Sequence, residues 1–211
     1  MQRLAELVVF AGRRQRGSQE PPRIWRRLFH LIAGSSIPLA GIFAPDREFL
    51  LALAVLAAGA VALDLSRFGI GPLNRVYMRW MGPLLKGEEV SRMTGATHML
   101  VGATIVFWLF GKEVAVPVMF YLSLGDPVAA MVGGRLPGPR LAGKSPGGAV
   151  AFAVTGSAVA VALVASGAIG YHWGLWAGAG IAAVVELAGI PPDDNLVVPL
   201  VAGAAMCAMG V

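Results

Sequence analysis

An aspartate lies inside an apolar stretch of this chain. Asp126 follows Gly125 within segment 114–134, which is long enough to form a membrane-crossing helix. A carboxylate at that depth costs about 2.5–3.5 kcal/mol unless it is paired or hydrated, and such groups usually serve a function. We therefore expect Asp126 to bind a metal ion in a polar cavity, with a structural Asp–Arg pair as the alternative.

The segment 133–148 is rich in glycine and proline and contains Arg135, Arg140 and Lys144. Exposed backbone N–H groups together with Lys144 would hold a phosphate, and Ser145 would cap the helix that follows. The Gly-Lys-Ser sequence resembles part of a P-loop, but no strand precedes this segment, so we expect no P-loop fold. A flexible loop without a ligand is the alternative.

A second group of carboxylates lies closer to the C-terminus. Glu186 ends an apolar segment, and Asp193 and Asp194 stand just before the apolar segment 195–211. Carboxylates in this arrangement suit magnesium bound to phosphates. Helix capping is the alternative role for the two aspartates.

A histidine and two threonines stand at the starts of two other apolar segments. His30 lies four residues after Arg26, so both share one face of a helix. Snorkelling to the membrane surface explains the arginine, whereas an uncommitted histidine at that depth would be unusual. Thr94 and Thr97 are candidates for ligand binding, and close helix packing is their alternative role.

The composition defines the class of protein that must position these residues. Of the 211 residues, 56% are hydrophobic and 14% are charged, whereas soluble domains carry about 25% charged residues. This excludes an ordinary soluble enzyme and a disordered chain. The single cysteine, Cys207, excludes an internal disulfide.

The apolar residues occur in blocks that predict an all-α fold, namely a polytopic membrane helix bundle. Several blocks are short, so we expect tilted helices or local thinning of the bilayer. An eighth span would follow if the N-terminal segment inserted. We expect about seven transmembrane helices, over residues 28–45, 49–63, 93–111, 114–134, 148–166, 174–187 and 195–211.

Two amphipathic segments accompany the predicted spans. Segment 1–22 combines apolar residues with arginines and is expected to lie on the membrane surface. The remainder, 23–211, is expected to form a single transmembrane catalytic domain. Loop 66–93 mixes aromatic and basic residues and predicts a further interfacial helix.

The basic residues predict the orientation in the membrane. With the N-terminus in the cytosol, all but two of the 17 lysines and arginines lie on the cytosolic side, the exceptions being Arg47 and Lys112. Most acidic residues fall on that side as well. A channel through the membrane does not predict this asymmetry, whereas a site for a charged, water-soluble substrate does.

A series of short motifs also occurs in a fixed order along the chain. The motifs are Arg27-x-x-His30-x-x-x-Gly34, Asp64-x-x-Arg67, Thr94-Gly-Ala-Thr97, Gly125-Asp126-x-x-Ala129-x-x-x-Gly133, Lys144-Ser145-x-x-Gly148-x-x-Ala151, Glu186 and Asp194-Asn195-x-x-x-Pro199. This series resembles the CTP-dependent polyprenol kinase family, which includes dolichol kinase, phytol kinase and CTP-dependent diacylglycerol kinase. That family is related to phosphatidate cytidylyltransferase. The resemblance extends over roughly residues 23–203, with Gly147 standing where the family usually has glutamate.

The resemblance implies a kinase that uses CTP and Mg²⁺ to phosphorylate the hydroxyl of a lipid alcohol at the cytosolic face. The expected metal ligands are Asp126, Asp194, Asp64 and Glu186. The residues expected to hold CTP are Gly125, Arg135, Arg140, Lys144, Ser145, Gly148, Thr94, Thr97 and Asn195. The expected catalytic residues are Asp126, Lys144, His30 and Glu186, and the sequence does not choose between an aspartate and His30 as general base.

Two other functions remain open on the sequence alone. A cytidylyltransferase would use the same cavity but release pyrophosphate, and a transporter would lack the reaction altogether. The expected partners are CTP, a lipid alcohol and the bilayer, with no nucleic acid and with a homodimer left open. We expect an integral protein of a prokaryotic plasma membrane, with its active site facing the cytosol.

Overall fold

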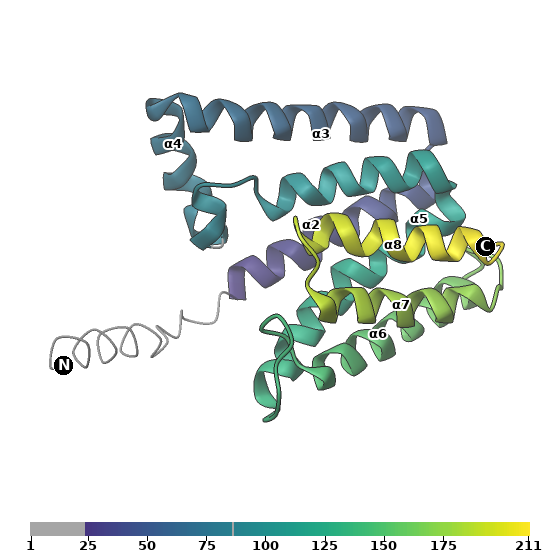
Figure 1. The fold of residues 1–211 in the computed structure, drawn as a ribbon. Coiled ribbons are helices and arrows are strands. Elements are labelled where there is room, and N and C mark those ends of the chain that lie inside the picture. Colours follow the sequence, from purple (N-terminus) through teal and green to yellow (C-terminus); the bar gives the residue numbers. More distant parts are fainter. Residues whose placement is uncertain (1–23, 86) are drawn as a thin grey trace, which may run out of the picture.

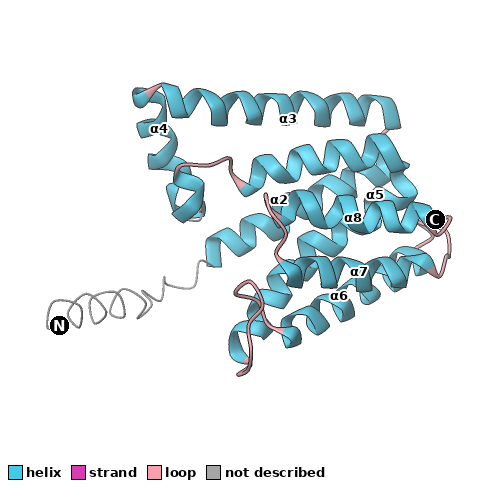
Figure 2. Ribbon diagram, viewed as in Figure 1, coloured by secondary structure: helices cyan, strands magenta, loops and turns pink. Residues whose placement is uncertain are grey.

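The computed structural model describes residues 24–85 and 87–211, and the regular elements in this part of the chain are helices (Figures 1 and 2). Segment 1–22, predicted to lie on the membrane surface, falls outside the described residues. The helices are α2 (Ile24–Phe43), α3 (Asp46–Gly69), α4 (Gly71–Met81), η1 (Gly82–Leu84), η2 (Gly87–Val90), α5 (Gly95–Arg135), α6 (Pro146–Ala165), α7 (Gly174–Ala188) and α8 (Asp194–Ala208).

Helix α5 is the central element, and it folds back on itself. It has 41 residues, and Gly111 interrupts it with φ 71° and ψ 177°, a conformation that is essentially restricted to glycine. Figure 1 shows the two halves running in different directions from this point. They correspond to the separate segments 93–111 and 114–134 of the sequence prediction, and together they pack against α2, α3, α6 and α8.

The core lies around the second half of α5. Val118 and Leu122 are fully buried there, together with Phe152 of α6 and Leu175 of α7. Small residues bring the backbones close: a side chain at Gly156 of α6 would lie 2.9 Å from Cβ of Ala179. Close packing through glycine and alanine is typical of helices in membranes.

Several helices suit a lipid environment. Among the described residues, α3, α5 and α6 are long and apolar enough to cross a membrane, and α7 and α8 are shorter apolar helices. Apolar side chains also face outward, with Val55 70% exposed and Val154 64% exposed. These features indicate an integral membrane protein, whereas the arrangement as seven spans stays a prediction.

The predicted interfacial loop 66–93 contains a helix, α4, which turns steeply away from the end of α3 (Figure 1). Pro72 stands in its first turn, where a missing backbone N–H costs nothing. Val76 and Trp80 of α4 are 58% and 75% exposed. This apolar exposure next to Arg75 and Arg79 agrees with a helix at the membrane surface.

The reversal at Gly111 can be tested by substitution. Gly111→Ala forces a side chain into a backbone conformation that costs roughly 1–3 kcal/mol, so we expect the free energy of unfolding in detergent to fall by that amount. Gly59→Ala in α3 is the matched control, because a Cβ there meets nothing within 4 Å, and it should be neutral or stabilising. Equal unfolding midpoints for the two variants would contradict the assigned reversal.

Candidate functional site

The first polar cluster joins α3 to the start of α5. Asp64 and Arg67, both 1% exposed, form an ion pair in which Arg67 Nε donates to Asp64 Oδ1 at 2.6 Å. The other oxygen of Asp64 accepts from Thr94 N at 2.9 Å and from Thr97 Oγ1 at 2.7 Å. Thr94 also caps α5, since its hydroxyl accepts from Thr97 N.

Arg67 extends this cluster into the segment before α5. Its guanidinium donates to the backbone carbonyls of Glu89, at 2.8 Å, and Arg92, at 2.6 Å. It also lies over the rings of Phe68 and Tyr77, 4.4 and 4.8 Å from their centroids. These contacts satisfy a buried charge on all sides, so the cluster anchors the start of α5.

This placement separates three predicted site residues from the rest. Both oxygens of Asp64 are already occupied by protein donors, and Thr94 and Thr97 are two of those donors. The hydrogen bonds of the two threonines to Asp64 join α5 to α3, which agrees with the packing role that the sequence left open for them. We therefore leave Asp64, Thr94 and Thr97 out of the site proposed for metal and nucleotide.

The second cluster surrounds Lys144. Its Nζ lies 2.6 Å from Asp194 Oδ2, 3.0 Å from Glu186 Oε1 and 2.5 Å from the backbone oxygen of Glu186. These contacts match the three N–H donors of an ammonium group. Lys144 thus ties the loop before α6 to the end of α7 and the start of α8. Burial alone would lower the pKa of Lys144, but the hydrogen bond to Asp194 and the charges of both carboxylates outweigh it and raise the pKa.

A tight turn positions Lys144. Leu141 and Lys144 exchange two backbone hydrogen bonds of 2.8 Å, and Ala142 and Gly143 between them have φ values of 48° and 82°. Positive φ at both central residues is typical of a type I′ turn. The segment Gly138–Ser145 has the full spacing of a P-loop, but it follows a helix instead of a strand, and the turn directs its lysine to carboxylates.

The two aspartates at the start of α8 have different roles, one in helix capping and one in an ion pair. Asp193 caps α8, because its Oδ1 accepts from Asn195 N at 3.0 Å, and it also accepts from Asn195 Nδ2 at 2.7 Å. Asp194 instead binds Lys144. Asn195 is buried against α5, where a side chain at Gly95 would lie 2.7 Å from its Nδ2. Asn195 thus joins α8 to the start of α5.

A cavity of about 260 Å³ opens between the end of α5, the loop before α6, and the end of α7. Asp126, Lys144 and Glu186 line it, as does Arg140, whose guanidinium donates to the carbonyl of Leu136. The side chain of Asp126 is 37% exposed, in contrast to 6% for Glu186. Asp126 is therefore the accessible carboxylate of the cavity.

The remaining predicted residues around this cavity have packing roles. Ser145 caps α6 by accepting from Gly148 N at 3.0 Å. A side chain at Gly125 would meet the Phe152 ring at 2.9 Å, and one at Gly148 would meet the Ala129 carbonyl at 2.8 Å. These glycines bring α5 and α6 together. Outside them, the exposed guanidinium of Arg135 donates to the carbonyl of Met131. A side chain at Gly147 would meet the end of the flexible Leu136 side chain.

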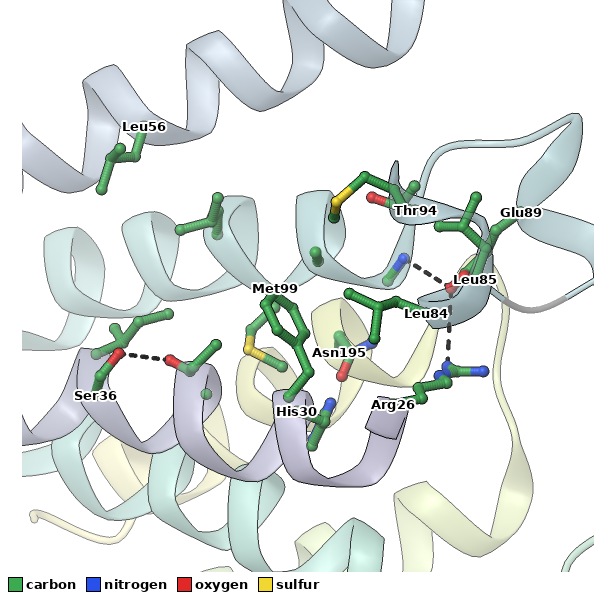
Figure 3. Close-up of a pocket in the computed structure, with 18 of the residues that line it drawn as sticks. Arg26, His30, Ser36, Leu56, Leu84, Leu85, Glu89, Thr94, Met99 and Asn195 are labelled. Carbon is green, nitrogen blue, oxygen red and sulfur yellow. Dashed lines mark hydrogen bonds and ion pairs between the residues drawn. The ribbon is translucent and has the colours of Figure 1, made fainter. Parts of the chain in front are cut away.

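His30 connects the cavity to a second space. Its Nε2 lies 3.9 Å from Asp126 Oδ2, while its ring lines a groove of about 290 Å³ between α2, α3, η1 and α5 (Figure 3). Most of the groove lining is apolar, including Phe29, Ile37 and Met99. The lining residues come from seven elements, α2, α3, α4, η1, η2, α5 and α8, which are far apart in the sequence. No local pattern in the sequence therefore indicates the groove as a whole.

The arrangement limits how a metal ion can be held. Among the described residues no group of three or more His, Cys, Asp or Glu side chains has the geometry of a metal site. Glu186 and Asp194 are engaged by Lys144. Magnesium in phosphate-transfer sites is held by one or two carboxylates and by the phosphates themselves. Asp126 fits that mode, as a single accessible carboxylate beside cationic side chains.

Comparison with known proteins gives a partial match. No protein-family model and no solved structure matches this chain. Three curated relatives do, and all bear the name CTP-dependent diacylglycerol kinase 1. The match is 34% identical over 70 residues in Schizosaccharomyces pombe, 32% over 71 residues in Saccharomyces cerevisiae and 34% over 87 residues in Eremothecium gossypii.

Part of this chain is similar to CTP-dependent lipid kinases. The matches cover 33%, 34% and 41% of this chain, and 32%, 24% and 27% of the three relatives. The chain therefore matches about a third or less of the length of these relatives. The similarity agrees with the resemblance found in the sequence, at the level of a CTP-dependent lipid kinase.

The Asp64 cluster predicts a structural role that can be measured. Asp64→Asn leaves the buried Arg67 charge without its counterion, so we expect the free energy of unfolding to fall by about 3–5 kcal/mol. Asp46→Asn, in an exposed ion pair with Lys112, is the control and should change it by less than about 1 kcal/mol. Full stability of Asp64→Asn in a detergent unfolding titration would contradict an anchoring role.

Lys144 offers a second stability test. Lys144→Met keeps the aliphatic stem but leaves Glu186 and Asp194 without their donor, so we expect a loss of about 1–3 kcal/mol. Lys112→Met, at an exposed lysine, is the control and should cost less than about 1 kcal/mol. If chemical unfolding gave the same small change for both variants, Lys144 would not hold α7 and α8 together.

Proposed function

We propose that this chain is a CTP-dependent lipid kinase that transfers the γ-phosphoryl group of CTP to the hydroxyl of a membrane lipid alcohol. The observation that carries the proposal is the junction at His30. On one side of it lies a cavity with an accessible carboxylate and cationic side chains, and on the other lies an apolar groove. The names of the three partial relatives support the same class of reaction.

The chemistry of the substrate is the next part of the proposal. The relatives are named for diacylglycerol, which makes diacylglycerol the first alcohol to test. Polyprenols, dolichol and phytol, which the sequence resemblance implied, are the other candidates. All of them combine one hydroxyl with long hydrocarbon chains.

The proposed reaction is an in-line phosphoryl transfer. A bond forms between the lipid hydroxyl oxygen and the γ-phosphorus of CTP, while the bond from that phosphorus to the β-phosphate oxygen breaks and CDP leaves. The hydroxyl proton passes to a base. Asp126 and His30 are the two candidates, because their polar atoms lie 3.9 Å apart at the boundary of cavity and groove.

The proposed binding site for the triphosphate consists of the groups that line the cavity. We propose that Asp126 holds Mg²⁺ on the phosphates, and the ion would neutralise charge on the transferred group. Arg140 supplies positive charge on the protein side. The N–H donors of Lys144 are engaged by Glu186 and Asp194, so Lys144 acts only through its charge. Lys144 acts from a fixed position, because Asp194 and Glu186 hold its ammonium group in place.

The membrane sidedness completes the proposal. All but two of the lysines and arginines lie on the predicted cytosolic side, which is where CTP would enter the cavity. We propose an integral membrane protein with a cytosol-facing site. The three relatives come from fungi and so lend no support to the expected prokaryotic plasma membrane.

The proposed activity can be tested in one assay. Detergent-purified protein is incubated with Mg²⁺, CTP labelled at the γ-phosphate, and diacylglycerol, geranylgeraniol, phytol, a polyprenol or phosphatidate. We expect label in a lipid phosphate together with release of CDP. Pyrophosphate release and a CDP-lipid formed from phosphatidate would establish a cytidylyltransferase instead, and absence of any product would overturn the kinase.

Asp126 is the decisive position within that assay. Asp126→Asn removes the accessible carboxylate with little change of shape, so we expect turnover to fall by about 100-fold or more. Its unfolding midpoint should stay near that of the parent, because no hydrogen bond within the described structure depends on the Asp126 charge. Asp46→Asn, an exposed carboxylate outside the cavity, should retain full turnover. Full activity of Asp126→Asn would overturn the site assignment.

A further inference from the structure

We infer that the apolar groove holds the hydrocarbon chain of the lipid alcohol, and that His30 at its polar end binds the hydroxyl beside Asp126. This inference rests on the proposed function and deepens it, because it gives the lipid a binding site of its own.

The groove has the composition of a hydrocarbon site. Its walls include Ala33 and Ile37 of α2, Leu84 of η1, and Met99 of α5, and Leu56 lies across from them on α3 (Figure 3). Helices α2 and α3 make little contact with each other, so the groove occupies the space between them. An apolar lining between two helices suits a chain that enters sideways from the bilayer.

The outer surface next to the groove is also apolar. Ile32 on α2 is 66% exposed and Leu56 on α3 is 57% exposed. A water-filled entrance would not favour such residues, whereas the acyl region of a bilayer would. The occupant with matching chemistry is therefore a membrane lipid, and a soluble metabolite or a polar peptide has no comparable fit.

Polar groups collect at one end of the groove. Figure 3 shows Arg26, His30, Glu89 and Asn195 together at this end, with Ser36 and Leu56 toward the other. Glu89 is fixed there, because its Oε1 accepts from Gly95 N at 2.9 Å and lies 3.8 Å from Arg26. A molecule with a long apolar body and a single polar end matches this distribution.

His30 has an unused hydrogen-bonding position at that end. Its Nε2 is buried and has no hydrogen-bond partner in the described part of the chain. The 3.9 Å to Asp126 Oδ2 is too long for a direct hydrogen bond, yet one hydroxyl oxygen can lie within hydrogen-bond distance of both atoms. Burial of an unsatisfied polar atom is unfavourable, and a bound hydroxyl would satisfy it.

The position of Asp126 gives this hydroxyl its role. Asp126 lines the cavity assigned to the triphosphate, and His30 lines the groove. A hydroxyl bound between them would face the phosphates while its hydrocarbon chain stayed in the groove. The reacting oxygen is thus positioned by the same pair of residues that can accept its proton.

Photolabelling tests the location of the lipid without requiring turnover. The full chain in detergent is irradiated with a diacylglycerol that carries a diazirine in one acyl chain and, separately, with a geranylgeraniol that carries one in its prenyl chain. We expect labelled peptides from α2, η1 and the first half of α5, and competition by the unmodified alcohol. Which probe labels these peptides distinguishes the two classes of alcohol. Labelling confined to other helices, by both probes, would overturn the inference.

A matched pair of variants tests the groove by kinetics. Ala33→Phe narrows the groove at a half-buried position, so we expect about a tenfold rise in KM for the lipid, with KM for CTP unchanged. Ala40→Phe adds the same ring at an exposed position of α2 outside the groove and should leave both constants unchanged. Equal KM values for lipid in the two variants, both folded as judged by unfolding midpoints, would count against the groove.

His30→Leu separates the hydroxyl contact from the hydrocarbon contact, because leucine has no hydrogen-bonding atom. We expect lipid labelling in the groove to persist while turnover falls by about 100-fold, because the chain still binds but the oxygen loses its partner. Full turnover would remove His30 from the inference.

The outcomes also separate this inference from the proposed function. A parent protein that labels in the groove but phosphorylates no lipid would contradict the kinase and leave the lipid site standing. A protein that phosphorylates lipid, yet labels elsewhere and tolerates Ala33→Phe, would retain the kinase and lose the groove.

Discussion

The ammonium group of Lys144 joins three segments of the chain next to the cavity. Lys144 lies between two carboxylates from separate helices, at 2.6 Å from Asp194 and 3.0 Å from Glu186, and it reaches them from a loop. Two carboxylates at the ends of neighbouring helices would repel each other without a cation between them. Because one lysine joins three segments, the wall of the cavity next to Asp126 depends on this interaction. Charge pairing at the helix ends therefore shapes the site. Close contacts between glycine and alanine residues hold the helices that carry it.

The sequence predicted the helical class and the approximate helix positions because apolar blocks and their breaks are local properties. It also identified Asp126 and His30 as chemically unusual, since polar residues in apolar segments are expensive wherever the chain folds. Lys144 was identified by its glycine-rich segment. The sequence could not assign partners. Asp64 and Asp126 are both isolated acids in the sequence, yet one is enclosed by Arg67 and two threonines and the other is accessible. That difference arises from tertiary packing, which no local pattern records.

The glycines also show that sequence patterns do not identify the groups that a residue contacts. Gly125 and Gly148 were expected to hold a nucleotide, but each lies where a neighbouring group leaves no room for a side chain. Glycine allows another group to approach the backbone closely, and that group can be either a phosphate or a second helix. A glycine-rich sequence alone therefore does not tell the two apart. In the structure Phe152 lies against the first glycine and the Ala129 carbonyl against the second, while Gly148 also lines the cavity, so its role in binding a nucleotide stays a prediction. The groove beside His30 is lined mostly by apolar residues from elements that are far apart in the sequence, so no local pattern indicates it.

The reversal at Gly111 has a consequence for distance. A straight helix of 41 residues would be about 60 Å long, roughly twice the thickness of the hydrocarbon layer of a membrane. Its two ends would then stand on opposite sides of any bilayer, with Thr94 and Asp126 far apart. Folded back, both ends approach α2, where His30 lines the same groove as Thr94 and lies 3.9 Å from Asp126. One residue without a side chain thus allows the longest element of the chain to bring residues from both of its halves to the same helix, α2.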